Sequence, residues 1–428
     1  MRAIVLDLVV FIIAIGALIV PRVGLYGYVW FGLMRPDVLA WSYGTQQYSM
    51  VMAIPILLGS LRYLPDIRVW FANPFCRGLL ALQAPLALSV LFAVVPALCS
   101  YPFQAYERVV VMGLLIPLLV RQEEHFRNLF LIMAFSLGFL GSKLGYWGVL
   151  HGGVHLTEGW GGMLSGNNEI ALAMAMAVPL CWYARRLEIP RWAKWMFLVM
   201  TFGCIATVVM SHSRGGAVAL VAALLFIVLR EQRRVAVMVV FAALVAPSVY
   251  LVKDSYLARL ETLQSPMEES SAASRIEYAQ AAFAMWKDYP ILGVGYGQEN
   301  YVRLSAQYLG RDAQQVVHNT YMQVLVDSGI FAFLMFIGLM LFTVIWLGMK
   351  ARKLRGTYPT MRLYLLALQA AIAAFGVGCT FGSREGYDFY YILIMCAASC
   401  YEILRNQHPG SLQEPDENIR VMDTVPAE

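Results

Sequence analysis

Residues 320–349 read TYMQVLVDSGIFAFLMFIGLMLFTVIWLGM, and this stretch decides the class of the fold. From Ile330 to Met349 it contains no charged residue. A run of about 20 apolar residues is long enough to cross the hydrocarbon core of a bilayer as one helix. We therefore predict a transmembrane helix here.

The rest of the chain repeats this pattern. Of its 428 residues 60% are hydrophobic and 14% are charged, whereas a soluble domain has about 45–50% apolar and about 25% charged residues. A soluble chain with so few polar residues could not cover its own core. We predict an all-α polytopic membrane protein with about twelve transmembrane helices and a retained first span. The predicted spans are 4–20, 46–61, 78–98, 106–120, 127–149, 167–184, 195–210, 214–229, 235–252, 320–349, 362–380 and 388–404.

Basic residues predict the orientation of these spans. Loops on the cytoplasmic side of a membrane carry an excess of lysine and arginine. One set of short loops holds most of them: Arg62, Arg68, Arg77, Arg121, Arg127, Arg185, Arg186, Arg191, Lys194, Arg230, Arg233, Arg234, Lys350, Arg352, Lys353 and Arg355. The alternate loops hold only Arg22, Arg35, Arg108, Arg214 and Arg384. We therefore expect both termini to be cytoplasmic.

This orientation divides the chain into four parts. They are residues 1–252 with transmembrane helices 1–9, a large outer loop at 253–318, residues 319–404 with helices 10–12, and a disordered cytoplasmic tail at 405–428. The apolar, aromatic-rich residues 24–34 are too short to span, and we expect them to lie at the interface or re-enter the membrane. The large loop is too long for a passive connection, so we expect it to be functional.

Two amphipathic helices are predicted inside the large loop. In residues 274–286, helical spacing places Ile276, Ala279, Phe283 and Trp286 on one face. Pro290 and the glycines of residues 291–297 end this helix, and a second one covers 299–308. Such faces would lie on the membrane or cap the bundle.

His318 is the candidate catalytic residue. It lies where the large loop meets the long apolar span, and histidine can accept and return a proton near neutral pH. A histidine at a membrane interface is often only a hydrogen-bonded structural residue, and that alternative stays open.

Positive charges on the outer side suggest an anionic ligand. The guanidinium fork of arginine fits phosphate oxygens, and a lysine inside an apolar span costs about 2.5–3.5 kcal/mol. The candidate diphosphate-binding residues are Arg214, Arg275, Arg311 and Lys143. The alternative is that these are separate loop charges that extend toward lipid headgroups.

Three polar residues are candidates for positioning a substrate, namely Asn168, Glu169 and Asn319. Asn168 and Glu169 open the sixth span, where capping of the helix already explains them, although they could also hold a sugar hydroxyl. No acidic pair marks a metal site, and we predict none. The seven cysteines show no C-x-x-C spacing and are expected to be buried small apolar residues.

These residues also carry a family resemblance. Arg275…Trp286…Pro290-Ile-Leu-Gly293-Val-Gly295, followed by His318-Asn319, nine residues and Gly329, resembles the signature of the O-antigen ligase/polymerase superfamily. Ser213-Arg214-Gly215-Gly216 is similar to its arginine-glycine motif, and residues 166–171 (GNNEIA) are similar to another of its blocks. Ala332 stands where the ligase pattern usually has a second glycine.

The resemblance implies a fold, a donor and an acceptor. It implies a membrane glycosyltransferase of the C type in the bacterial inner membrane, with its site facing the periplasm and with neither metal nor cofactor. The donor would be an undecaprenyl-diphosphate-linked glycan, and the ligase branch would transfer it to a lipid A–core sugar. Polymerase and protein O-glycan ligase branches remain alternatives, and a lipid-linked glycan flippase is an alternative of another class. Membrane lipids are expected neighbours, and no nucleic-acid partner is expected.

Overall fold

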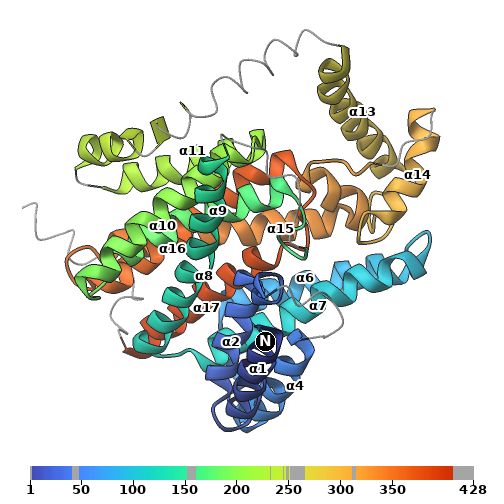
Figure 1. Ribbon diagram of the computed structural model, residues 1–428. Coiled ribbons are helices and arrows are strands. Elements are labelled where there is room, and N and C mark those ends of the chain that lie inside the picture. Colours follow the sequence, from blue (N-terminus) through green and yellow to red (C-terminus); the bar gives the residue numbers. More distant parts are fainter. Residues whose placement is uncertain are drawn as a thin grey trace, which may run out of the picture.

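The structure is a computed structural model that describes residues 2–40, 48–151, 161–231, 233–243, 245–246, 250, 266–310 and 315–407. The regular elements within these residues are all helices (Figure 1). Eight of them are long and apolar enough to cross a membrane. They confirm an all-helical polytopic membrane protein, while the number of twelve spans stays a prediction.

The helices before the large loop follow the apolar runs of the sequence. They are α1 (Arg2–Ile19), α2 (Pro21–Met34), α3 (Pro36–Leu39), α4 (Tyr48–Ser60), η1 (Leu61–Asp66), α5 (Arg68–Ala72), α6 (Pro74–Leu91), α7 (Pro96–Leu119), α8 (Glu123–Leu150), α9 (Asn167–Ala184), α10 (Arg191–Met210) and α11 (Arg214–Arg230). After it come α13 (Pro266–Asp288), α14 (Glu299–Leu309), α15 (Thr320–Lys353), α16 (Pro359–Gly378), η2 (Cys379–Phe381) and α17 (Asp388–Gln407).

One boundary of the predicted layout needs correction. The boundary between the third and fourth spans lies at residues 92–95, where α6 ends and α7 begins at Pro96, and not at 99–105. Residues 24–34 belong to α2, whose buried Leu25, Val29 and Leu33 pack against α1, α4 and α8. Their place at the interface or in a re-entrant piece stays a prediction. Of the predicted ninth span, 235–252, the structure describes a short apolar helix at Arg234–Ala243.

Helix α9 lies at the centre of the bundle. All its residues from Ile170 to Ala184 are buried, and α8, α10, α11 and α16 pack around it. Its alanines let neighbouring helices approach closely, as small residues do between membrane helices. The first turn of this central helix is thereby held firmly among its neighbours.

The large loop docks on a kink in α15. At Gly329 the backbone leaves the helix, with φ 77° and ψ −177°. The carbonyls of Val326 and Asp327 accept hydrogen bonds from the backbone of Val294 and Gly295, both at 2.9 Å. A Cβ on Gly329 would lie 2.1 Å from the Ile291 carbonyl oxygen, so only glycine fits this joint. The loop is therefore fastened to α15 by backbone hydrogen bonds.

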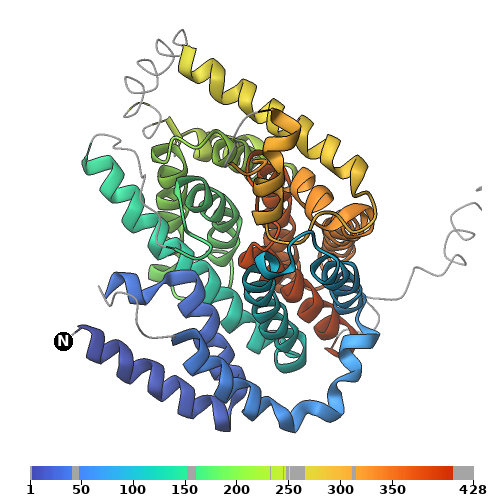
Figure 2. The same ribbon diagram turned by 90° about the vertical axis from the view of Figure 1, so that its right-hand side faces the viewer.

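Both predicted loop helices are present, as α13 and α14. Another face of α13 packs against the rest of the loop, and the placement of the predicted apolar face on the membrane stays a prediction. Ile276 and Phe283 are 61% and 43% exposed, whereas Tyr278, Ala282 and Met285 are buried. A small core that includes Ala282, Met285 and residues of the 290–297 turn and α14 determines which face is covered. In both views α13 lies at the opposite end of the molecule from α1–α4 (Figures 1 and 2).

Candidate functional site

His318 lies in a strained turn immediately before α15. Its φ of 56° is in the left-handed region that side chains other than glycine rarely adopt. Its backbone N–H donates a hydrogen bond to Ser383 Oγ at 3.1 Å. Strain of this kind is retained where surrounding contacts fix it, often at functional sites. The turn thus holds the imidazole in a defined place.

The surroundings of His318 keep its imidazole neutral. The side chain is half-buried, and burial lowers its pKa below the ordinary value of 6.5. The positive charges of Arg275 and Arg384 lower the pKa further, while Glu169 opposes them. A neutral imidazole near neutral pH can accept a proton, as a general base must.

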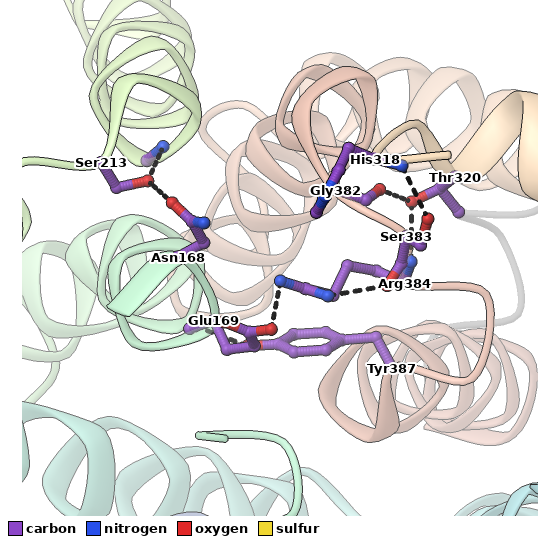
Figure 3. A network of polar contacts seen from close by, with 10 residues as sticks. Asn168, Glu169, Ser213, His318, Thr320, Gly382, Ser383, Arg384 and Tyr387 are labelled. Carbon is purple, nitrogen blue, oxygen red and sulfur yellow. Dashed lines mark hydrogen bonds and ion pairs between the residues drawn. The ribbon is translucent and has the colours of Figure 1, made fainter. Parts of the chain in front are cut away.

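The loop at 382–387 completes the support of this turn. Thr320 Oγ1 donates to the Gly382 carbonyl oxygen at 2.6 Å and accepts from the backbone N–H of Arg384 at 3.0 Å. The Arg384 guanidinium forms an ion pair with Glu169, the third residue of α9 (Figure 3). Two segments 215 positions apart in the chain therefore meet beside His318.

Arg214 is the first residue of α11, and the glycines after it set its position. A Cβ on Gly215 would lie 2.5 Å from Cβ of Phe381, and one on Gly216 would lie 2.3 Å from Cβ of Ala171. The start of α11 can therefore lie directly against α9 and η2. The Arg214 side chain is exposed at this end of the bundle.

Two of the predicted positioning residues already have structural contacts. Asn319 caps α15, because its Oδ1 accepts from the backbone N–H of Met322 at 3.1 Å. Asn168 Oδ1 accepts from Ser213 Oγ at 2.7 Å, and that hydroxyl caps α11 through Gly216 N–H at 3.0 Å (Figure 3). Any role of these two amides in holding substrate stays a prediction.

The other predicted cations differ in their relation to the site. Arg275 lies in α13 and is close enough for its charge to act on His318. Lys143 is exposed on α8 and is not among the groups that shift the pKa of His318. Arg311 lies outside the residues that the structure describes.

A cavity of about 340 Å³ opens beside this network. Four carboxyl groups line it, from Glu169, Glu299, Glu385 and Asp388, together with Ser383 and Arg384. Burial raises the pKa of Glu385 well above its ordinary value, and the nearby Asp327 raises it further. The cavity thus combines acidic character with two residues that also surround His318.

Sequence reasoning missed Arg384 and Glu385 as site residues. Arg384 was noticeable only as one of few basic residues in the predicted outer loops, and nothing in the sequence pairs it with Glu169. Glu385 gave no signal of its own. Only the packing of α9 against α16 and the following loop brings these residues to His318.

Comparison with known proteins identifies the family of this region. A family profile described as O-Antigen ligase matches residues 197–337, which include Arg214, Arg275 and His318. No curated protein matches the chain. The matched residues include the strained His318 and the neighbouring Arg275, and the match relates this part of the chain to the O-antigen ligase/polymerase superfamily.

Proposed function

We propose that the chain is an O-antigen ligase, an inverting glycosyltransferase that acts without metal or cofactor. Its donor is an undecaprenyl-diphosphate-linked glycan, and its acceptor is a sugar hydroxyl of lipid A–core. It works in the bacterial inner membrane with its site facing the periplasm. The family supports activity of the ligase/polymerase kind in general, and the acceptor and location are parts of the proposal.

The observation that supports this most strongly is a half-buried histidine with a lowered pKa beside two arginines. In the proposed step the acceptor hydroxyl oxygen attacks the anomeric carbon of the donor sugar from the face opposite the diphosphate. Its proton moves to an imidazole nitrogen of His318. The bond between the anomeric carbon and the diphosphate oxygen breaks, and its electron pair leaves with undecaprenyl diphosphate.

Arginines take the role of stabilising the leaving group. Arg214 and Arg275 hold the diphosphate, and their fixed positive charges stabilise the negative charge that develops on it. Arg311 and Lys143 are further candidates for this role. The lipid tail of the donor lies against the transmembrane helices.

The test is His318→Ala in purified protein supplied with lipid-linked glycan and acceptor. Loss of a general base should reduce transfer by about 10²–10⁴-fold, with unchanged amounts of protein in the membrane. His151→Ala is the matched control, since His151 is an exposed histidine at the end of α8. Transfer within a few-fold of the native rate in His318→Ala would end the assignment of the base.

Other functions predict other products. A deletion strain that accumulates full-length glycan on the lipid carrier lacks a ligase, whereas one that accumulates single repeats lacks a polymerase. Glycan that joins to protein would indicate the protein O-glycan ligase branch. Movement of lipid-linked glycan across vesicles without any covalent product would indicate a flippase.

A further inference from the structure

We propose that the acidic cavity beside Arg384 binds the acceptor sugar, and that it selects uncharged sugars over phosphorylated ones. This inference rests on the proposed glycosyl transfer and names where one of its two substrates lies. It assigns the acceptor to the carboxylates, while the donor diphosphate stays with Arg214 and Arg275.

The charges of the cavity favour this assignment. Among the described residues that line it, Arg384 is the only basic one, and Glu169 already forms an ion pair with that guanidinium. Glu299, Glu385 and Asp388 are the remaining charged or chargeable groups of the wall. A diphosphate in this cavity would lie beside Glu299 and Asp388 and would find only one guanidinium, which is already paired with Glu169. Sugar hydroxyls can both donate and accept hydrogen bonds, so they suit carboxyl groups in either protonation state.

Glu385 adds a buried carboxyl group to the wall of the cavity. Its side chain is only 5% exposed, and it shares a hydrogen bond with the fully buried Asp327. Burial and this neighbour raise the pKa of Glu385 well above its ordinary value. A carboxyl group of this kind can hydrogen-bond a hydroxyl without presenting a full negative charge.

The shape and walls of the cavity fit a sugar. Its volume of about 340 Å³ lies at the lower end of the range for small-molecule sites. Tyr106 and Tyr296 line it with ring centroids 5.5 Å apart, and Phe103 packs against both rings. This aromatic cluster gives an apolar surface for the C–H face of a sugar ring.

The carboxylates are not arranged as a metal site. In the part of the chain that the structure describes, no group of three His, Cys, Asp or Glu side chains could hold a metal ion. The acids are instead spread over α9, α14, the 382–387 loop and the start of α17. Groups distributed in this way can contact several hydroxyls of one ring.

The cavity also adjoins the proposed base. Ser383 and Arg384 line it, and the same Ser383 hydroxyl accepts the hydrogen bond from His318 N–H. Figure 3 shows His318, Ser383, Arg384 and Glu169 in one network. An acceptor held here lies against the residues that position His318.

The experiment measures sugar binding to the full-length protein in phospholipid nanodiscs by saturation-transfer NMR. The probes are methyl glycosides of glucose, galactose, mannose and N-acetylglucosamine, each compared with the corresponding sugar 6-phosphate. We expect at least one glycoside to bind and its phosphate to bind at least tenfold more weakly. Glu299→Ala should weaken glycoside binding about tenfold, because it removes a charged hydrogen-bond acceptor. Glu277→Ala, an exposed glutamate of α13 outside the cavity, should have no effect.

The outcomes separate this inference from the proposed function. Binding of no glycoside, tighter binding of the phosphates, or unchanged glycoside binding in both Glu299→Ala and Glu299→Gln would overturn the acceptor site. Undecaprenyl diphosphate binding should stay unchanged in the Glu299 variants and be lost in Arg214→Ala. If glycosides bind as expected but no lipid diphosphate binds and no transfer occurs, the proposed function fails while the sugar site stands.

Discussion

At the scale of single residues, the sequence indicated candidate cations and a candidate base but not how they combine. His318, Arg214 and Arg275 stand out because a proton acceptor and outer-side arginines are unusual in a membrane protein. The pairing of Arg384 with Glu169 could not be predicted, because it depends on the packing of segments 215 positions apart. Charge and residue type alone indicated the candidate site residues, whereas only the tertiary structure showed which residues they contact.

The pKa of His318 predicts a shift in the pH dependence of transfer. A base works in its neutral form, so the rate falls as pH drops through its pKa, which lies below 6.5. Arg275→Gln removes a positive neighbour and should therefore raise this pKa. We expect the acidic limb of the kcat/KM profile to move to higher pH, in addition to any loss of donor binding.

The matched control for this shift is Arg303→Gln. Arg303 is an exposed arginine of α14 that does not act on His318. Its substitution should leave the limb in place. An acidic limb at the same pH in native protein and Arg275→Gln would mean that His318 does not set it.

At the scale of elements, the sequence predicted the existence of α13 and α14 correctly. It did not reveal that a second face of α13, with Ala282 and Met285, packs against α14 and the 290–297 turn, because only tertiary contacts bring these segments together. The glycine motif of residues 293–297 gave a turn in the sequence. In the structure this turn also packs against the kink in α15, where its backbone N–H groups donate hydrogen bonds to α15 carbonyls.

From the contact between the 290–297 turn and the kink at Gly329, we predict that Gly329→Ala destabilises the protein. Positive φ with extended ψ is essentially restricted to glycine and costs other residues about 1–3 kcal/mol, and the new Cβ would also clash with the Ile291 carbonyl. We expect a lower melting temperature in detergent and a reduced transfer rate.

Gly338→Ala is the internal control for this change. Gly338 lies in the same helix, and nothing would lie within 4 Å of its Cβ. The melting temperature of the Gly338→Ala variant should match or exceed that of the native protein. Equal melting temperatures for Gly329→Ala and the native protein would contradict the role of the joint.

At the scale of the whole molecule, composition alone was sufficient to predict a polytopic helical membrane protein. The number of spans is harder to predict, because α9 is a buried central helix that opens with Asn167, Asn168 and Glu169. Such polar residues lower its mean hydropathy, although its neighbours bury it from Ile170 to Ala184. A helix enclosed by protein need not be as apolar as one that faces lipid, so hydropathy underestimates it.

The predicted orientation can be tested with introduced cysteines, since all seven native cysteines are buried. Gln307→Cys places a thiol on exposed α14, and Arg355→Cys places one on the exposed turn after α15. A membrane-impermeant maleimide added to intact spheroplasts should label the first and not the second. Labelling of Arg355→Cys should require permeabilised membranes, and the reverse pattern would invert the orientation.

The ion pair between Glu169 and Arg384 also determines when during synthesis the protein can become active. Glu169 leaves the ribosome 215 residues before Arg384, a delay of roughly 10–40 s at about 5–20 residues per second. For part of that interval His318 has already been synthesised, but the 382–387 loop that supports its turn has not. The support of the His318 turn is therefore completed only late in synthesis, so a chain that ends before residue 382 would lack it.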